Sequence, residues 1–279
     1  MKLQMVQAGQ FYLDGGAMFG VVPKTIWSKT NEADEKNRIL LSCRCLLVET
    51  DDRKILIDTG LGDKQTAKFF GFYDWDVNND IREKVREAGV DPEDITDVFF
   101  THLHFDHCGG AVVAGEGGEP GLAFPKATHW SHSKHWHWAV YPNAREKASF
   151  LKENILPIEA SGKLKFADKG HDLPFEFVEV CGHTQSQMLP LIEVGGKKVL
   201  YAADLLPTAG HVPLPYVMGY DVNPLKTLEE KKKWLEWVEK ENVILFLEHD
   251  AQYDCCTLKS TEKGPRVDRL MSLEEALEA

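Results

Sequence analysis

The stretch that decides the fold runs from Thr101 to Gly110 and reads THLHFDHCGG. It begins at the end of a short apolar run, DVFFT at 97–101, which predicts a buried strand. Its metal-binding residue types are His102, His104, Asp106 and His107, in the pattern H-x-H-x-D-H. Such a dense group of polar side chains is costly to bury unless a metal ion or charge partners compensate it. The stretch therefore predicts a metal site at the end of a strand.

The spacing within this motif suggests two ions. Where strand geometry persists, residues i and i+2 point to the same side, so we expect His102 and His104 to converge on one ion. Asp106 and His107 fall where the chain leaves the strand and can turn toward a second ion. The glycine pair at 109–110 is expected to let the backbone turn tightly there. Imidazole and carboxylate ligands suit zinc and its first-row neighbours.

Two imidazoles leave the first ion short of ligands, so others must come from distant parts of the chain. His183 in CGHTQS, Asp204 in LYAADLLP and His249 in ILFLEHD each follow an apolar run that predicts a strand. Loops at strand ends are where a rigid scaffold presents functional residues. We therefore expect one ion at His102, His104 and His183, a second at Asp106, His107 and His249, and Asp204 bridging the two.

The rest of the chain alternates predicted strands and helices, which indicates an α/β or α+β sandwich. Strands are expected at 42–49, 54–58, 97–101, 175–180, 189–194, 198–202 and 243–247. Helical stripes are expected at Ile81, Val85 and Ala88 and at Leu225, Leu228, Leu235 and Val238, and a capping box at Ser272 and Glu275. The Gly-rich stretch at 114–120 is expected to be a surface loop. Without a repeat or a low-complexity linker, we expect a single domain over residues 1–279.

Composition narrows the class of protein. The formal net charge of −12 disfavours a broad nucleic-acid-binding face, because an acidic surface repels phosphate backbones. The start of the chain has no apolar core like that of a signal peptide, and the apolar segment at 39–48 is too short to span a bilayer. The six cysteines form no C-x-x-C pair, so buried, reduced thiols are expected. We expect a cytoplasmic protein with no membrane partner.

Taken together, these motifs resemble the metallo-β-lactamase-fold hydrolase superfamily. The resemblance covers most of the chain and includes, in order, ILIDTG at 55–60, THLHFDHCGG, GHT at 182–184 and the segments around Asp204 and His249. It implies a four-layer αββα sandwich with the metals at one edge. It also implies that Asp58 supports the histidine loop, because a carboxylate behind a ligand fixes its orientation.

Within the superfamily, the chain is most similar to the branch of acyl-homoserine lactonases and methyl parathion hydrolases. Lactonases commonly carry a tyrosine three residues after the bridging aspartate, where this chain has Pro207. Tyr201, Tyr216 and Tyr220 are candidates to replace it. The frequent G-H-x-x-G-H pattern is also altered, because residues 186–187 are Ser-Gln.

Two further stretches are open to more than one interpretation. Residues 129–138 read HWSHSKHWHW and contain His129, His132, His135 and His137. We favour a strand end followed by an amphipathic helix over a second metal site. The aromatic residues Phe69, Phe70, Phe72, Tyr73 and Trp75 are expected either to line an apolar acyl or aryl pocket, to contact a partner subunit, or to pack in the core.

These observations predict a metal-dependent hydrolase. A hydroxide bridging two divalent ions would attack a small ester, lactone or related acyl substrate, with Asp106 as the catalytic residue that orients it and moves its proton. Hydrolysis of a phosphotriester or phosphodiester on the same site is an alternative, and a non-catalytic metal-binding or sensing protein is an alternative of another class. Zinc is the expected metal, although manganese and iron accept the same ligands. The substrate is expected to be a small molecule, and a homodimer is left open.

Overall fold

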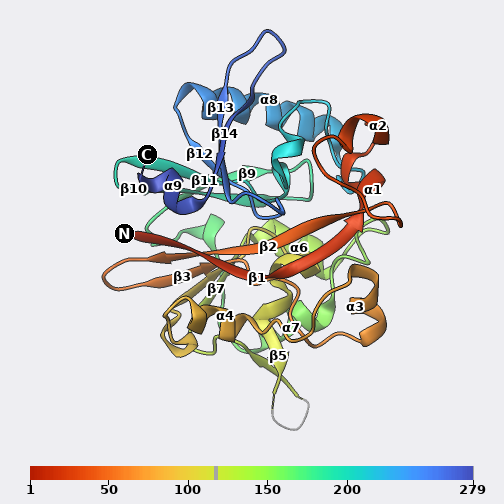
Figure 1. The fold of residues 1–279 in the computed structure, drawn as a ribbon. Helices are drawn as coiled ribbons and strands as arrows, with labels where there is room; N and C mark the ends of the chain where they lie inside the picture. Colours follow the sequence, from red (N-terminus) through yellow and green to blue (C-terminus); the bar gives the residue numbers. More distant parts are fainter. Residues whose placement is uncertain (116–118, 279) are drawn as a thin grey trace. The chain divides into compact units, whose positions relative to one another are not determined.

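The computed structural model describes residues 1–115 and 119–278, which group into two compact units (Figure 1). The first unit comprises Met1–Gly9, Cys43–Pro174 and Ser186–Met188, and the second comprises Gln10–Ser42, Phe175–Gln185 and Leu189–Ala279. The chain passes between the units inside strands β1 (Lys2–Asp14), β2 (Arg38–Glu49) and β10 (Gln187–Val194), and also at 174–175 and 185–186, outside the strands. Residues 116–118 of the expected loop at 114–120 lie outside the described residues. The prediction of a single domain stays a prediction.

The first unit is built on a six-stranded sheet with the order β1-β2-β3-β4-β7-β8. The strands not yet given are β3 (Lys54–Ile57), β4 (Asp97–Phe99), β7 (Thr128–Ser131) and β8 (Leu164–Phe166). β2 and β3 are antiparallel, whereas β3, β4, β7 and β8 run parallel. Parallel strands end at the same edge of a sheet, so the loops after β3 and β4 lie together there. These two loops carry Asp58 and the H-x-H-x-D-H stretch.

The helices of the first unit connect these strands. They are α3 (Ala67–Tyr73), α4 (Ile81–Glu87), α5 (Phe105–Cys108), α6 (Ser133–Val140) and α7 (Lys152–Ala160), with 3-10 turns η1 (Pro92–Asp94), η2 (Gly109–Ala111) and η4 (Ala167–Lys169). A small hairpin pairs β5 (Val112–Ala114) with β6 (Pro120–Leu122). The sequence explains where α4 begins and which face it buries. Asp80 caps its start by accepting a hydrogen bond from Arg82 N, and Ile81 and Val85 of the predicted apolar stripe are buried.

The second unit contains a sheet with the order β14-β13-β12-β11-β10-β9. Its further elements are β9 (Glu176–Val180), β11 (Lys197–Tyr201), β12 (Ile244–Phe246), β13 (Cys255–Lys259), β14 (Arg266–Met271), α1 (Gly15–Phe19), α2 (Lys24–Trp27), α8 (Pro224–Lys240), α9 (Leu273–Glu278), η5 (Ala203–Leu205) and η6 (Ala209–His211). β11 and β12 are parallel, with Tyr201 opposite Phe246. The chain segments that follow them, which hold Asp204 and His249, therefore leave the sheet at one edge.

Most predicted elements are confirmed, with small differences at their ends. The capping box is present, because Ser272 N donates to Glu275 Oε2 and Glu275 N donates to Ser272 Oγ. The His-rich stretch forms β7 followed by α6, as favoured. One residue of the predicted apolar stripe on α8 is not buried: Leu225 is 73% exposed. The buried face of the first turns of this helix carries the polar side chains of Thr227 and Glu230 instead. No helix in the described part of the chain is long and apolar enough to cross a membrane.

Candidate metal centre

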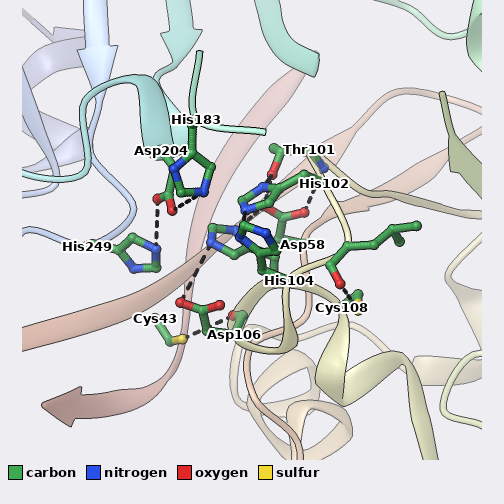
Figure 2. Close-up of polar contacts among 12 residues, drawn as sticks. Cys43, Asp58, Thr101, His102, His104, Asp106, Cys108, His183, Asp204 and His249 are labelled. Atoms are coloured by element: carbon green, nitrogen blue, oxygen red, sulfur yellow. Dashed lines mark hydrogen bonds and ion pairs between the residues drawn. The ribbon is translucent and has the colours of Figure 1, made fainter. Parts of the chain in front are cut away.

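The first pair of predicted ligands lies in the loop that follows β4. His102 Nε2 and His104 Nδ1 are 3.1 Å apart, and both imidazoles are buried (Figure 2). Two nitrogens bound to one tetrahedral zinc at about 2.0–2.1 Å are about 3.3 Å from each other. The pair therefore fits a shared ion, as the i, i+2 spacing predicts.

Asp106 and His107 lie one step further along, in the short helix α5. Both are buried, and His107 Nε2 is 3.8 Å from Asp106 Oδ2. The chain has left the strand at this point, as expected, and has begun a helical turn. The two side chains thus present one imidazole nitrogen and one carboxylate oxygen as neighbours.

Asp58 contacts the histidine loop from behind. It directly follows β3 and has a positive φ of 57°, an unfavourable conformation for a residue with a Cβ. Its Oδ1 accepts from Thr101 N at 2.8 Å and its Oδ2 from Thr101 Oγ1 at 2.7 Å. The same Oδ2 is 3.1 Å from His107 Nδ1, and Thr101 Oγ1 is 3.0 Å from His102 Nδ1. One buried carboxylate thus engages the Nδ1 side of two histidines, directly or through a hydroxyl, and leaves their Nε2 atoms for other partners.

Sequence reasoning missed two groups that support this loop. Glu146 is buried, and its Oε1 lies 3.4 Å from His104 Nε2, while Trp138 Nε1 and Asn143 Nδ2 donate to its Oε2. His135, from the His-rich stretch, accepts a hydrogen bond from Leu103 N at 2.8 Å through its Nε2. A buried glutamate downstream of a motif has no local signal in the sequence, because its partner is set by tertiary packing.

The glycine pair of the motif has a different physical reason from the expected one. Gly109 has an ordinary φ of −60°, so no special turn geometry requires it. A Cβ on Gly109 would instead lie 2.1 Å from Leu61 O, and one on Gly110 would lie 2.2 Å from Thr59 O. The pair therefore allows the motif to pack directly on the backbone that follows β3.

Ser186 and Gln187 stand where the resembling pattern has glycine and histidine, and the structure shows what each of them does. Ser186 adopts a left-handed φ of 54°, the conformation for which glycine is the usual residue. Gln187 is buried, and its Nε2 lies 3.3 Å from His102 Nδ1. Gln187 therefore contributes to the surroundings of His102 in the position where the resembling pattern has histidine.

In the second unit, Asp204 lies between two histidines (Figure 2). Its Oδ2 is 3.1 Å from His183 Nε2, and its Oδ1 is 3.2 Å from His249 Nε2. Each oxygen thus faces a different imidazole, which is the arrangement a carboxylate needs to bridge two cations. His183, Asp204 and His249 are all buried.

Both of these histidines are oriented from their Nδ1 side. His183 Nδ1 is 2.9 Å from Asp221 Oδ1, and His249 Nδ1 is 2.7 Å from the carbonyl oxygen of Ser42. A carbonyl oxygen can only accept, so His249 donates from Nδ1, and in the neutral imidazole the lone pair is then on Nε2. Asp221 is a further residue that sequence reasoning missed.

The three tyrosine candidates all lie in the second unit. Tyr201 is fully buried in β11 and stacks on Phe246. Tyr216 packs edge-on against Phe19, and Tyr220 is 38% exposed. Tyr201 is therefore a core residue.

The seven predicted ligands fall into two groups. The first unit brings together His102, His104, Asp106 and His107, and the second brings together His183, Asp204 and His249. Burying so many imidazoles and carboxylates together is costly unless a cation or charge partners compensate them. The donor set fits zinc, manganese or iron.

Comparison with known proteins adds the family context. Residues 38–249 match the family described as the metallo-beta-lactamase superfamily. An N-acyl homoserine lactonase from a Bacillus species is 27% identical over 267 residues, which are 91% of this chain and 94% of the relative. A probable metal-dependent hydrolase from Staphylococcus aureus has a TM-score of 0.88 and 29% identity, covering 98% of this chain and 97% of that one. AidC, a dizinc quorum-quenching lactonase solved with a product, has a TM-score of 0.76 and 23% identity, covering 97% and 95%.

Proposed function

Since this chain belongs to the metallo-β-lactamase superfamily, we propose that its two ligand groups jointly hold two divalent cations and that it hydrolyses a small lactone or ester. The observation that carries the proposal is Asp204, whose two oxygens each face the Nε2 of a different histidine. A carboxylate placed in this way is suited to join two ions. His102, His104 and His183 would hold one ion, and Asp106, His107 and His249 the other.

The broader predictions made from the sequence are confirmed. The chain has the α/β (α+β) fold class of the metallo-β-lactamase type and is a metal-dependent hydrolase similar to the lactonase branch. Lactonase structures that resemble this chain, AidC among them, hold a small-molecule product. For this chain, the substrate class and the ligand roles are parts of the proposal.

The proposed mechanism divides the work between the ions and the protein. When bound, the ions supply positive charge that polarises a carbonyl group and lowers the pKa of a water molecule toward neutrality. In this proposal Asp106 orients the attacking water and accepts its proton, a role that a carboxylate can take as general base. Its carboxylate lies beside His107 Nε2, which would bind the same ion. As the water oxygen bonds to the carbonyl carbon and the ring C–O bond breaks, Asp106 returns that proton to the leaving oxygen. The product is a hydroxy acid.

A cluster of aromatic rings beside Asp106 favours an apolar substrate. Phe105, between His104 and Asp106 in the motif, is contacted by Phe69 and Tyr73 of α3, with ring centroids 5.3 and 4.8 Å away. Burial and the negative charge of Asp106 raise the pKa of Tyr73 to about 12, so its hydroxyl stays protonated. These rings would accommodate an acyl chain better than a charged phosphodiester.

The proposal is tested by metal analysis joined to a substrate panel. The purified chain, loaded with zinc, manganese or iron, is assayed on lactones with acyl chains of increasing length, aryl esters, phosphotriesters and phosphodiesters. We expect two ions per chain and the highest kcat/KM on a lactone. Asp106→Asn should lower kcat by at least about 100-fold while the fold remains, because proton transfer contributes about 10²–10⁴-fold.

Each contrary result has a defined meaning. Full activity in Asp106→Asn would refute the role of Asp106. A preference for phosphotriesters would replace the lactonase proposal with the alternative hydrolase. Two bound ions without turnover of any substrate would favour a metal-sensing protein.

A further inference from the structure

The loop that carries His183 rests on the first turns of α8, and we propose that Asp221 is a positioning residue that fixes His183 for metal binding. This inference rests on the proposed function, since the ion belongs to that centre. The inference concerns how the protein orients His183, and it adds no ligand to the proposed set. All of the residues involved lie in the second unit.

Asp221 is placed to hold one orientation of the His183 ring. Its carboxylate is 1% exposed, and Oδ1 lies 2.9 Å from His183 Nδ1. Its other oxygen, Oδ2, accepts a hydrogen bond from Thr227 Oγ1 at 2.8 Å, which fixes the plane of the carboxylate. With Nδ1 donating to this carboxylate, the neutral imidazole of His183 has its lone pair on Nε2, the form that binds a metal. That Nε2 lies 3.1 Å from Asp204 Oδ2.

The main chain before His183 is held separately by Glu230. Oε1 of Glu230 accepts from Cys181 N at 2.8 Å, and Oε2 accepts from Gly182 N at 2.9 Å. In return, Asn223 N donates to Gly182 O at 2.9 Å and Val222 N donates to His183 O at 3.1 Å. The loop is therefore bonded on both its amide and its carbonyl sides.

Gly182 makes this close contact possible. A Cβ at this position would lie 2.3 Å from Thr227 Oγ1 and 2.5 Å from Thr227 N. Any larger residue would clash with Thr227, so either the loop or the start of α8 would have to shift. The glycine before His183 thus has a packing reason in this chain.

The polar character of the start of α8 supports a role beyond helix packing. Thr227 and Glu230 occupy the buried face there, where apolar side chains would ordinarily stabilise a helix. Burying a carboxylate is costly unless its hydrogen bonds serve a partner. In this case the partners are Asp221 and the backbone of the His183 loop. Residues behind metal-binding histidines typically affect metal affinity by about 10–100-fold.

The test measures metal binding as well as activity. Zinc affinity is determined by competition with a chromophoric chelator, and the absorption spectrum of the cobalt-loaded protein reports ligand geometry. Asp221→Ala should lower the affinity for one of the two ions by about 10–100-fold and shift the cobalt spectrum. Thr227→Val, which removes the hydroxyl that holds Asp221, should have a smaller effect in the same direction, and Thr227→Ser should restore the wild-type values.

Asn223→Ala is the matched control. Asn223 Oδ1 accepts from Lys226 N and caps α8, so losing this side chain weakens the same helix. The variant keeps the main-chain amide that donates to Gly182 O and removes no side-chain partner of His183. We expect its zinc affinity to stay within about twofold of wild type, since it leaves the groups behind the ligand in place. Two-bond proton–nitrogen spectra of the zinc-loaded protein should show His183 protonated at Nδ1 in wild type.

The outcomes separate this inference from the proposed function. Wild-type zinc affinity in both Asp221→Ala and Thr227→Val would overturn the inference, as would an equal loss in Asn223→Ala. If Asp221→Ala fails to fold, the Thr227 pair decides alone. Ion loss in the variants without hydrolysis by wild type would overturn the function only, and a wild-type chain that binds no ion would overturn both.

Discussion

At the scale of single residues, Gly109 shows how tightly the motif is seated. A Cβ there would meet the backbone oxygen of Leu61 at 2.1 Å, a contact that cannot be relieved by rotating a side chain. We expect Gly109→Ala to lower the free energy of unfolding by about 3 kcal/mol, in the upper range for overpacking. Urea unfolding of the metal-free protein measures this without a contribution from the ligands.

The control for this substitution is Gly71→Ala. Gly71 lies inside α3, and an added Cβ would meet nothing within 4 Å. It should therefore stabilise the protein by about 0.5–1 kcal/mol, because alanine loses less conformational freedom than glycine in a helix. A loss of stability in Gly71→Ala equal to that in Gly109→Ala would mean that the contact with Leu61 is not the cause.

The residue scale also shows what the sequence could reveal. The ligand candidates were identifiable because the motif is dense and each distant candidate follows an apolar strand. Asp221, Glu146 and Glu230 were not, because nothing local distinguishes a carboxylate that reaches a ligand loop from an exposed one. Their roles depend on tertiary contacts between segments dozens of residues apart in the sequence.

At the scale of elements, Lys231 joins α8 to the loop that precedes it. Its Nζ is buried and lies within hydrogen-bond distance of four carbonyl oxygens, those of His211, Pro213, Leu214 and Tyr216, of which the Leu214 contact is the longest at 3.4 Å. Lys231→Met should lower the free energy of unfolding by about 3 kcal/mol, because it removes the donor that the buried carbonyl oxygen of His211 and several part-buried carbonyl oxygens share. Thermal and urea unfolding both measure the change.

An exposed neighbour provides the comparison for Lys231. Lys232 lies on the solvent side of α8, so Lys232→Met removes the same charge without opening buried hydrogen bonds. Its expected effect is within about 0.5 kcal/mol of wild type. Similar losses in the two variants would show that charge, and not the buried carbonyl contacts, determines the effect.

The same helix explains where pattern reading failed. Apolar periodicity placed Leu225 on the buried face, yet the structure exposes it and buries Thr227 and Glu230 instead. Periodicity assumes that a buried face is apolar, which is not true where a helix holds a ligand loop. Strand β1 was missed for a related reason: its buried residues Leu3, Val6, Ala8 and Phe11 do not follow the strict alternation of a half-buried strand.

At the scale of the whole molecule, buried histidines predict sensitivity to acid. Burial lowers the pKa of His129 to about 4 and that of His211 to about 3. An unfolded histidine has a pKa of about 6.5, so the unfolded chain binds more protons below that pH. Stability should therefore be fully present above about pH 6.5 and should fall as the pH drops toward 4.

The contribution of His129 can be isolated by substitution. In His129→Asn the amide nitrogen can still donate to Ala127 O, the contact that His129 Nδ1 makes at 3.1 Å. Between pH 7 and pH 5, the free energy of unfolding of the variant should fall by about 2 kcal/mol less than that of wild type. Urea unfolding of the metal-free proteins measures the difference. The same slope in both proteins would show that His129 does not carry this sensitivity. His137→Asn, at an exposed position of α6, reports the general effect of removing a histidine.

Asp204 has a consequence for how the proposed centre would fill. Its Oδ2 is committed to the side of His183 and its Oδ1 to the side of His249. Two cations that share one carboxylate do not bind independently. Occupancy of either site alters the affinity of the other site for its ion, and by the same factor in both directions. A calorimetric titration of the empty protein should therefore yield an isotherm that no pair of independent sites describes, and Asp204→Ala should remove that coupling.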